Sequence, residues 1–361
     1  MFERSAGSVE LAFSVRACHQ AGMRWAALLL ALLGLGLTAG LVAWQGVGPV
    51  LDGVARVGLG GVLIVTGVRV AAVGVAGIGW RLLLPRRLPC PATVPVTLRY
   101  VREAINALLP VAQVGGDVAG GRLLSFWGVP GAVCGASIVV DTTMQAGTQF
   151  VFALIGIAVL AAAPQASRDL VLWLAGGSAL AAAALLGFVV AQRLGLFKLA
   201  EGALRRLARA VGGAAGRGGG DDDGGTLAGL HDAIQAIYRA RGRIAASFVV
   251  HLAGWLVGVG EVWAALALMG RDPTLAEALV LESLGQAVRG AAFAVPGALG
   301  AQEGGFVVLG ALYGLPADAA LALSLVKRIP DFMIGIPGLL AWQALEGRRA
   351  FLRRQGRRGR A

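Results

Sequence analysis

Residues 296–305 read PGALGAQEGG, and they interrupt an otherwise apolar part of the chain. The stretch lies between the apolar runs Ala291–Val295 and Phe306–Leu312, where a membrane helix would continue unbroken. Its proline lacks a backbone donor and its four glycines weaken a helix, so the backbone is expected to break here. The same ten residues include a glutamine and a glutamate. A break that carries a carboxylate predicts a polar site inside an apolar fold.

The composition of the whole chain is that of an integral membrane protein. Its 361 residues are 57% hydrophobic and 14% charged, whereas soluble domains have about 25% charged residues. A water-soluble fold of this size could not bury so much apolar surface. The net charge is +12, but the basic residues flank apolar runs. They therefore indicate membrane topology and contact with anionic lipids, not nucleic-acid binding.

The residue types needed for catalysis or metal binding are sparse. Three cysteines and three histidines are scattered along the chain without a zinc or disulfide spacing. The sequence has no GxxxxGK[ST] phosphate loop. We therefore expect no cofactor, no metal site and no catalytic centre.

Six apolar runs are long enough to cross a bilayer as helices, which takes about 20 residues. They are Trp25–Trp44, Val57–Leu84, Pro130–Ala163, Leu170–Val190, Ile244–Met269 and Ala317–Leu345. We expect an all-α, polytopic membrane protein with about six full spans.

The spans belong to one predicted transmembrane domain at residues 25–345. Its halves, 25–190 and 244–345, are joined by the polar loop 191–243. Within this loop, residues 212–225 are rich in glycine and aspartate, which predicts disorder. A polar segment, 1–24, precedes the domain, and a basic tail, 346–361, follows it.

Positive charges predict the orientation of the domain. Residues 191–243 carry nine Lys or Arg and the tail carries seven arginines, and residues 81–102 are also basic. The intervening loops carry one each: 45–56, 164–169 and 270–274. By the positive-inside rule, the basic regions and both termini are expected in the cytoplasm.

Two segments, 93–128 and 275–316, are too broken to span the bilayer. Each contains a helix-like piece, a Pro/Gly break and a second short piece. Each must also begin and end on one side for the charge rule to hold. We therefore predict two re-entrant hairpins, whose broken backbones are tolerated only where protein or water buries them. The first hairpin enters from the cytoplasm and the second from outside.

The two hairpins share an order of residues: an arginine, a proline, an amide and an acid. These residues are Arg102, Pro110, Gln113 and Asp117 in the first, and Arg289, Pro296, Gln302 and Glu303 in the second. A later span in each half carries a further acid, Asp141 or Asp331. We interpret the match as an inverted repeat, whose paired breaks mark the binding site in transporters.

The predicted substrate site lies near the bilayer midplane, where the two breaks meet. The helix N-terminus after a break suits an anion such as a phosphate, while nearby carboxylates suit a cation. The residues assigned to the site are Gln113, Asp117, Arg289, Gln302 and Glu303, with Arg102, Asp141, Lys327 and Arg328 nearby.

Structural roles are the alternative for several of these residues. Asp117 and Glu303 could cap the half-helices that follow the breaks, and Arg102 and Arg289 could snorkel to the surface. Arg69, about 12 residues into its span, should have an acid partner because a charge inside the membrane is costly. The candidates are Asp141, Glu261, Glu282 and Asp331. His251, on an apolar helix, fits a packing residue.

The hairpin sequences REAINALLPVAQVGGDVAGGRLL (102–124) and ESLGQAVRGAAFAVPGALGAQEGGFVVLGALYGLP (282–316) resemble a known family. This is the lysylphosphatidylglycerol synthase transmembrane-region, or flippase-like, family, and the likeness is closest to its hopanoid-associated HpnL-type branch. The resemblance runs from about Ala26 to Gln343. In SLVKRIPDF (324–332) the sequence departs from the family pattern at Pro330, which leaves the role of Asp331 open.

The resemblance implies a multi-pass protein of the bacterial inner membrane that handles polar lipids, with flipping as the activity. The soluble aminoacyl-transferase domain of bifunctional relatives is expected to be absent. We therefore predict a translocase for a polar or anionic lipid, with hopanoid-related lipids among the candidates, whose partners are membrane lipids. The alternatives are an accessory or scaffold subunit among lipid-biosynthesis membrane proteins, a lipid-headgroup transferase and an ion-coupled carrier of a small solute.

Overall fold

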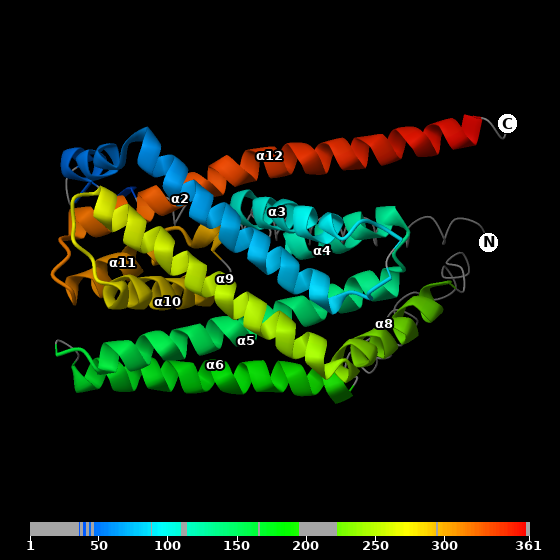
Figure 1. Ribbon diagram of the computed structural model, residues 1–361, viewed down its shortest axis with the longest axis horizontal. Coiled ribbons are helices and arrows are strands. Elements are labelled where there is room, and N and C mark those ends of the chain that lie inside the picture. Colours follow the sequence, from blue (N-terminus) through cyan, green and yellow to red (C-terminus); the bar gives the residue numbers. More distant parts are fainter. Residues whose placement is uncertain are drawn as a thin grey trace, which may run out of the picture.

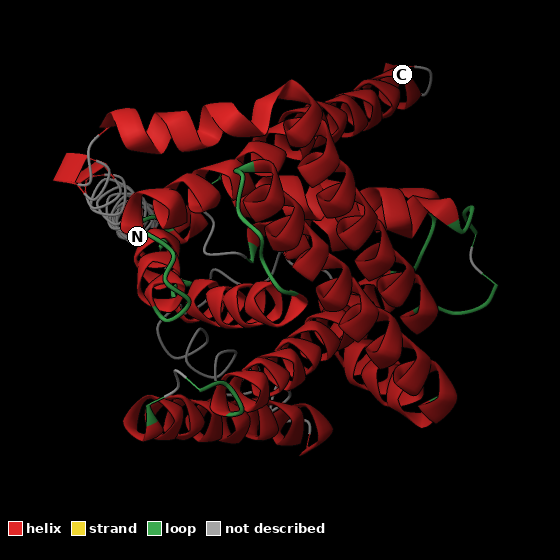
Figure 2. Ribbon diagram, turned by 60° about the vertical axis from the view of Figure 1, so that its left-hand side comes forward, coloured by secondary structure: helices red, strands yellow, loops and turns green. Residues whose placement is uncertain are grey.

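The computed structural model describes residues 36, 39–40, 43–44, 47–87, 89–109, 114–164, 167–194, 222–293 and 295–358. Every regular element in these ranges is a helix (Figure 2), which confirms the all-α prediction for this part of the chain. Gln113 and segment 1–24 lie outside the described residues, as does most of the predicted span Trp25–Trp44.

Four of the described helices are long and apolar enough to cross a membrane. They are α2 (Val47–Leu83), α5 (Gly131–Ala161), α6 (Arg168–Leu194) and α9 (Arg241–Leu268). They overlap four of the predicted spans, because each predicted apolar run is long enough to cover the bilayer core. In α2 the chain bends at Gly58, whose φ is +61°, next to the predicted start of the span at Val57.

The last predicted span, Ala317–Leu345, lies in helix α12 (Ala317–Arg358). Helix α12 continues through Pro330 and Pro337, so Pro330 does not end the helix and Asp331 stays in register with Lys327. The basic tail is also helical as far as Arg358, since α12 runs on without interruption. Charged residues in its middle and at its end keep α12 outside the group of four apolar spans.

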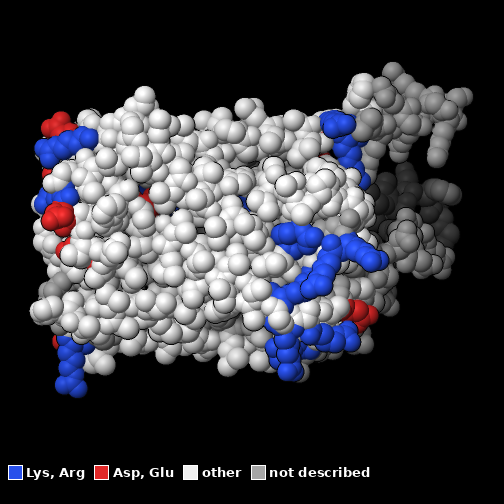
Figure 3. All heavy atoms as spheres, in the orientation of Figure 1, with Lys and Arg blue, Asp and Glu red and all other residues white. Residues whose placement is uncertain are grey.

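On the face shown in Figure 3, the surface is almost free of charged residues along the middle of the long axis and charged toward both ends. One of these ends carries the basic regions of the sequence. Helix α2 ends there and α9 begins there, and the two helix ends are joined by a hydrogen bond from Arg243 Nε to the Leu82 carbonyl at 2.9 Å. Large apolar side chains are exposed along the helices between the ends, for example Leu63, Leu180 and Leu340. An apolar belt between polar ends is what a bilayer requires of a protein that spans it.

Two helical hairpins reach into this belt from opposite ends (Figure 1). Helices α3 (Thr93–Leu108) and α4 (Gly115–Leu124), followed by η1 (Ser125–Trp127), enter from the end where α2 finishes. Helices α10 (Leu275–Ala291) and α11 (Ala301–Ala311) enter from the other end, and η2 (Pro296–Ala298), which lies in their break, contacts α3. The helix–break–helix pattern is therefore present in both segments. Their placement in a membrane and the inverted repeat stay predictions.

One part of the sequence that was predicted to be disordered is helical. Residues 222–225 begin helix α8 (Asp222–Arg239), which packs on α5, while residues 212–221 lie outside the described part. The glycine-rich composition suggested disorder, but these residues are continuous with an amphipathic segment that buries Ile234 and Ile237 against α5. Tertiary packing therefore extends the helix into a weak local sequence.

Helices α3 and α4 approach each other closely at glycine. A Cβ atom placed on Gly116 would collide with the backbone oxygen of Arg102, and one on Gly120 would lie 2.5 Å from Arg102 Cγ.

We expect Gly116→Ala to lower the free energy of unfolding by about 1–3 kcal/mol, because the backbone of α3 must shift. Thermal unfolding in detergent measures this loss. Gly187→Ala in α6, where the added methyl meets open space, is the control. Equal melting temperatures for the two variants would contradict the prediction.

Candidate functional site

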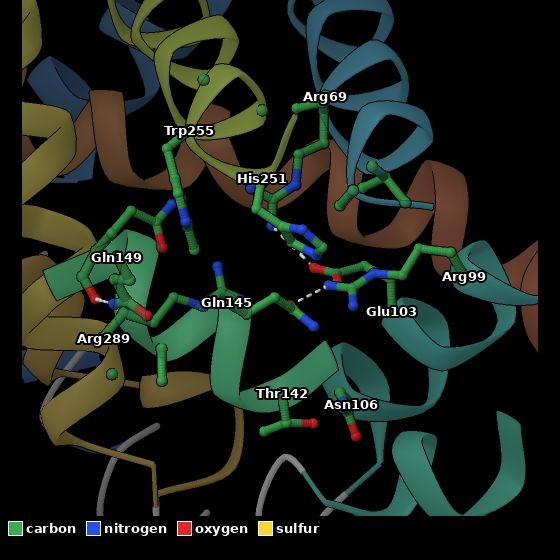
Figure 4. Close-up of a pocket in the computed structure, with 18 of the residues that line it drawn as sticks. Arg69, Arg99, Glu103, Asn106, Thr142, Gln145, Gln149, His251, Trp255 and Arg289 are labelled. Atoms are coloured by element: carbon green, nitrogen blue, oxygen red, sulfur yellow. Dashed lines mark hydrogen bonds and ion pairs between the residues drawn. The ribbon is translucent and has the colours of Figure 1, made fainter. Parts of the chain in front are cut away.

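A cavity of about 270 Å³ lies between the two hairpins. Arg69 of α2, Gln145 of α5 and Trp255 of α9 line it, and each lies near the middle of its membrane-spanning helix. Helices α3, α4 and α10 complete the wall. Figure 4 shows labelled side chains of α2, α3, α5, α9 and α10 around one common space. The cavity is therefore near the centre of the apolar belt, where a polar wall needs a specific reason.

The wall of the cavity is polar and mixed in charge. Three arginines, three carboxylates and several amides line it: Arg69, Arg99, Arg289, Glu103, Asp117, Glu282, Asn106, Gln145, Gln149 and Gln286. A buried charge is stable only when opposite charges or hydrogen bonds compensate it. The contacts of these groups therefore decide which are structural and which are available to a ligand.

Arg102 is the central cation of the first hairpin. Its side chain is 1% exposed, with Nη2 2.7 Å from Asp117 Oδ1 and Nη1 2.8 Å from Asp141 Oδ2. Its guanidinium also lies over the ring of Trp80 at 4.6 Å. Thr142 donates to the second oxygen of Asp117 at 3.1 Å. The snorkelling alternative is therefore wrong for Arg102, and Asp117 joins α4 to α3 and α5 instead of capping α4.

Glu303 stabilises the break of the second hairpin. Its Oε2 accepts a hydrogen bond from the backbone N–H of Gly300 at 2.7 Å, so the predicted capping role is confirmed. Its Oε1 accepts from Arg328 at 2.7 Å and from Ser324 at 3.2 Å. Arg328 also donates to the carbonyl of Gly297 at 3.0 Å. Glu303 and Arg328 thus hold the break against α12, outside the cavity wall.

Arg289 is held more loosely and faces the cavity. It donates to Gln302 Oε1 at 3.3 Å and lies 3.3 Å from Asp331 Oδ2. Both distances exceed those of Arg102, so Arg289 forms weaker contacts. The snorkelling alternative is wrong here as well, since Arg289 is directed at α11 and α12. Gln302 donates in turn to Ser324 Oγ at 3.1 Å.

The predicted acid partner of Arg69 is present. Arg69 lies 3.3 Å from Asp331 and 3.9 Å from Glu261, two of the four candidates, and 3.2 Å from Glu103, which the sequence did not indicate. Asp331 therefore pairs with both Arg69 and Arg289, which gives it a defined role although Pro330 precedes it.

Lys327 is buried between two carboxylates. Its Nζ lies 2.8 Å from Glu282 and 3.2 Å from Glu261, and its side chain is 4% exposed. Gln286 donates to the other oxygen of Glu282 at 2.8 Å. Lys327 is thus a counter-ion behind the cavity wall, where it neutralises acids of α9 and α10.

His251 lines the cavity and contacts a carboxylate, in addition to the packing role that the sequence suggested. Its ring is buried and lines the cavity, and Nε2 lies 3.1 Å from Asp141 Oδ1. Asp141 also accepts from Gln145 at 2.8 Å and lies 3.4 Å from Arg99. Asp141 therefore collects cations and donors from α3, α5 and α9.

The sequence-predicted residues fall into three groups. Asp117 and Arg289 line the cavity, and Arg102, Asp141 and Gln302 contact residues that line it. Glu303, Lys327 and Arg328 stand behind the wall as supports. Gln113 lies outside the described residues.

Eight further polar or aromatic residues of the wall were missed: Arg99, Glu103, Asn106, Thr142, Gln145, Gln149, Trp255 and Gln286. A signal existed for most of them. Asp141, Gln145 and Gln149 recur every four residues in an apolar run, which puts them on one helix face. The polar residues of α3, from Arg99 to Asn106, follow the same three-to-four spacing.

Comparison with protein families shows that residues 26–338 match the family model described as "Lysylphosphatidylglycerol synthase TM region". The matched range includes both hairpins and every residue that lines the cavity. Comparison with curated proteins gave no match, and neither did comparison with solved structures.

Proposed function

The chain belongs to the lysylphosphatidylglycerol synthase TM-region family, and from this premise we propose that it is a lipid translocase. Family membership and the four apolar helices make it a multi-pass membrane protein linked to lipid metabolism. The observation that carries the proposal is a polar, charged cavity near the centre of the apolar belt, between hairpins that reach in from opposite ends. A lipid headgroup can occupy such a cavity while its tails stay in the bilayer.

The proposed substrate is a polar or anionic lipid, with the hopanoid-related class among the lipids to be tested. The planar guanidinium of arginine matches the oxygens of a phosphate, and three arginines face the cavity. Arg289 is the main candidate contact because its protein partners are both 3.3 Å away. A phosphate can replace those weak contacts without leaving Arg102 or Lys327 unpaired.

In the proposed cycle the two hairpins are re-entrant and act as alternate gates. The first is at the basic end, which we place in the cytoplasm of the bacterial inner membrane together with both termini. The second reaches in from the opposite side. Asp331 of α12 contacts Arg69 of α2 and Arg289 of α10, so movement of one hairpin can be transmitted through α12.

Translocation by purified protein in vesicles tests the proposal. We expect Arg289→Gln to slow the flipping of a tail-labelled fluorescent phosphatidylglycerol by about tenfold or more, since a charged contact of a buried headgroup is worth about 1.5–3 kcal/mol. Loss of fluorescence on addition of a membrane-impermeant quencher measures the rate. Arg122→Gln is the matched control, because Arg122 is 62% exposed and pairs with Glu346 away from the cavity. Equal rates for wild type and Arg289→Gln would refute the site.

The same vesicles separate the proposal from the other functions. The translocase contains no bond-forming step, so the lipids should leave the assay chemically unchanged. A new lipid species in the mass spectrum would favour a headgroup transferase. An accessory or scaffold subunit would show no flipping by itself and would need a second membrane protein of the lipid pathway.

A further inference from the structure

The hydrogen bonds of His251 define where one of its protons lies. Nδ1 is 2.9 Å from the backbone carbonyl oxygen of Ser247, which can only accept. Nδ1 is also 3.3 Å from the hydroxyl of Ser247, whose proton is donated to the carbonyl of Gly79 at 2.9 Å. Both neighbours are acceptors toward the ring, so these partners assign a proton to Nδ1.

The other ring nitrogen faces a carboxylate. Nε2 of His251 lies 3.1 Å from Oδ1 of Asp141, and neither atom has a hydrogen-bond partner among the described residues. A nitrogen lone pair and a carboxylate oxygen repel each other at this distance. A proton between them turns the repulsion into an ion pair, with His251 as a cation.

The charged groups near His251 include fewer cations than carboxylates, so an added proton is compensated. Arg99 and Arg102 of α3 face Asp141, at 3.4 and 2.8 Å. Glu103 pairs with Arg99, and Asp117 of α4 pairs with Arg102. The hairpin-1 cluster thus has two cations and three carboxylates. From α2, Gly79 lies against the His251 ring and Arg69 lines the same cavity, and from α5 the amide of Gln145 donates to Asp141.

The rest of the ionic network is joined to this cluster, because Arg69 lies 3.2 Å from Glu103. It contains four cations and four carboxylates: Arg69, Arg289, Lys327, Arg328, Glu261, Glu282, Glu303 and Asp331. The joined network of described residues therefore has six cations and seven carboxylates, a deficit of one positive charge, and His251 contacts it at Asp141. Buried charges are costly unless they are compensated, and a proton on His251 supplies the missing charge.

We propose that His251 and Asp141 form a proton-binding site, and that lipid translocation requires loading and release of this proton. The coupling rests on the proposed translocase function, whereas the proton site does not. His251 lines the cavity, so loss of its proton leaves a net negative charge beside the headgroup. That charge disfavours an anionic headgroup at short range in a medium of low dielectric constant. The protonated site accepts the anion and the deprotonated site expels it.

Nitrogen NMR of ¹⁵N-histidine-labelled protein in nanodiscs tests the proton site without any transport assay. The chain has only three histidines, so a His19→Gln/His231→Gln background leaves the signal of His251 alone. We expect both ring nitrogens to be protonated at pH 7. In Asp141→Asn we expect the neutral ring, with its proton on Nδ1. A neutral His251 ring at pH 7 in the wild-type site would overturn the proposal.

Flipping of the labelled phosphatidylglycerol under an imposed pH gradient tests the coupling. We expect a gradient of two pH units to change the wild-type rate severalfold and to leave the rate of His251→Gln unchanged. Arg122→Gln should respond as wild type does. The double variant Asp141→Asn/His251→Gln removes the unpaired carboxylate, which guards against loss of folding. A protonated His251 with gradient-independent flipping would refute the coupling alone, and no flipping at any pH would refute the translocase.

Discussion

Replacement of Arg102 by methionine is expected to remove about 3–5 kcal/mol from the free energy of unfolding. Arg102 is 1% exposed and is the shared counter-ion of Asp117 and Asp141, at 2.7 and 2.8 Å. Methionine keeps most of the volume but no charge, so both carboxylates lose a partner, and Asp141, which is 0% exposed, cannot gain water in its place. The variant should also lose the link between α3, α4 and α5.

A matched control separates burial from hydrogen-bond geometry. Arg122 and Glu346 form a two-point ion pair of similar length, at 2.6 and 3.0 Å, but Arg122 is 62% exposed. Arg122→Met should cost at most about 1 kcal/mol, because water screens the exposed pair. Unfolding of the purified variants by heat or by SDS in detergent micelles measures both losses. Similar losses for the two arginines would contradict the role given to burial.

Replacement of Lys327 by methionine is expected to be about as damaging, again about 3–5 kcal/mol. The ammonium of Lys327 lies between Glu282 and Glu261, at 2.8 and 3.2 Å, and no part of it lines the cavity. Without it the two acids of α9 and α10 repel each other across a buried interface. The second hairpin should therefore detach from α9 and α12 before the rest of the fold opens.

A second substitution makes this prediction specific. Lys327→Met/Glu282→Gln removes one charge of each sign and leaves Glu261 with Arg69 at 3.9 Å, so much of the lost stability should return. Addition of Glu282→Gln to the wild-type chain should instead destabilise it, since Lys327 then keeps a single counter-ion. A double-mutant cycle on these four proteins measures the coupling. Additive losses would show that Lys327 and Glu282 act independently.

The sequence determined the long apolar helices of this protein and the positions of its breaks. Apolar runs such as Pro130–Ala163 predicted α5 within two residues at each end, because an apolar run long enough for the bilayer must close its hydrogen bonds within a helix. Pro296 and its glycines marked the second break for a local reason, the loss of a backbone donor and the freedom of glycine. Local rules of this kind act within a few residues and can be read without a fold.

Only the tertiary structure decided which charges meet. Lys327 pairs with Glu261 and Glu282, which are far from it in sequence. Arg69 contacts two of its four candidate acids, Glu261 and Asp331, and also Glu103, which the sequence did not indicate. A bilayer requires a helix to span it but leaves the rotation and crossing of that helix to packing against its neighbours. Ion pairs form over a few ångströms, so their partners depend on that packing. For the same reason the sequence indicated only a packing role for His251 on an apolar helix. Its contact with Asp141 forms because α5 and α9 pack side by side.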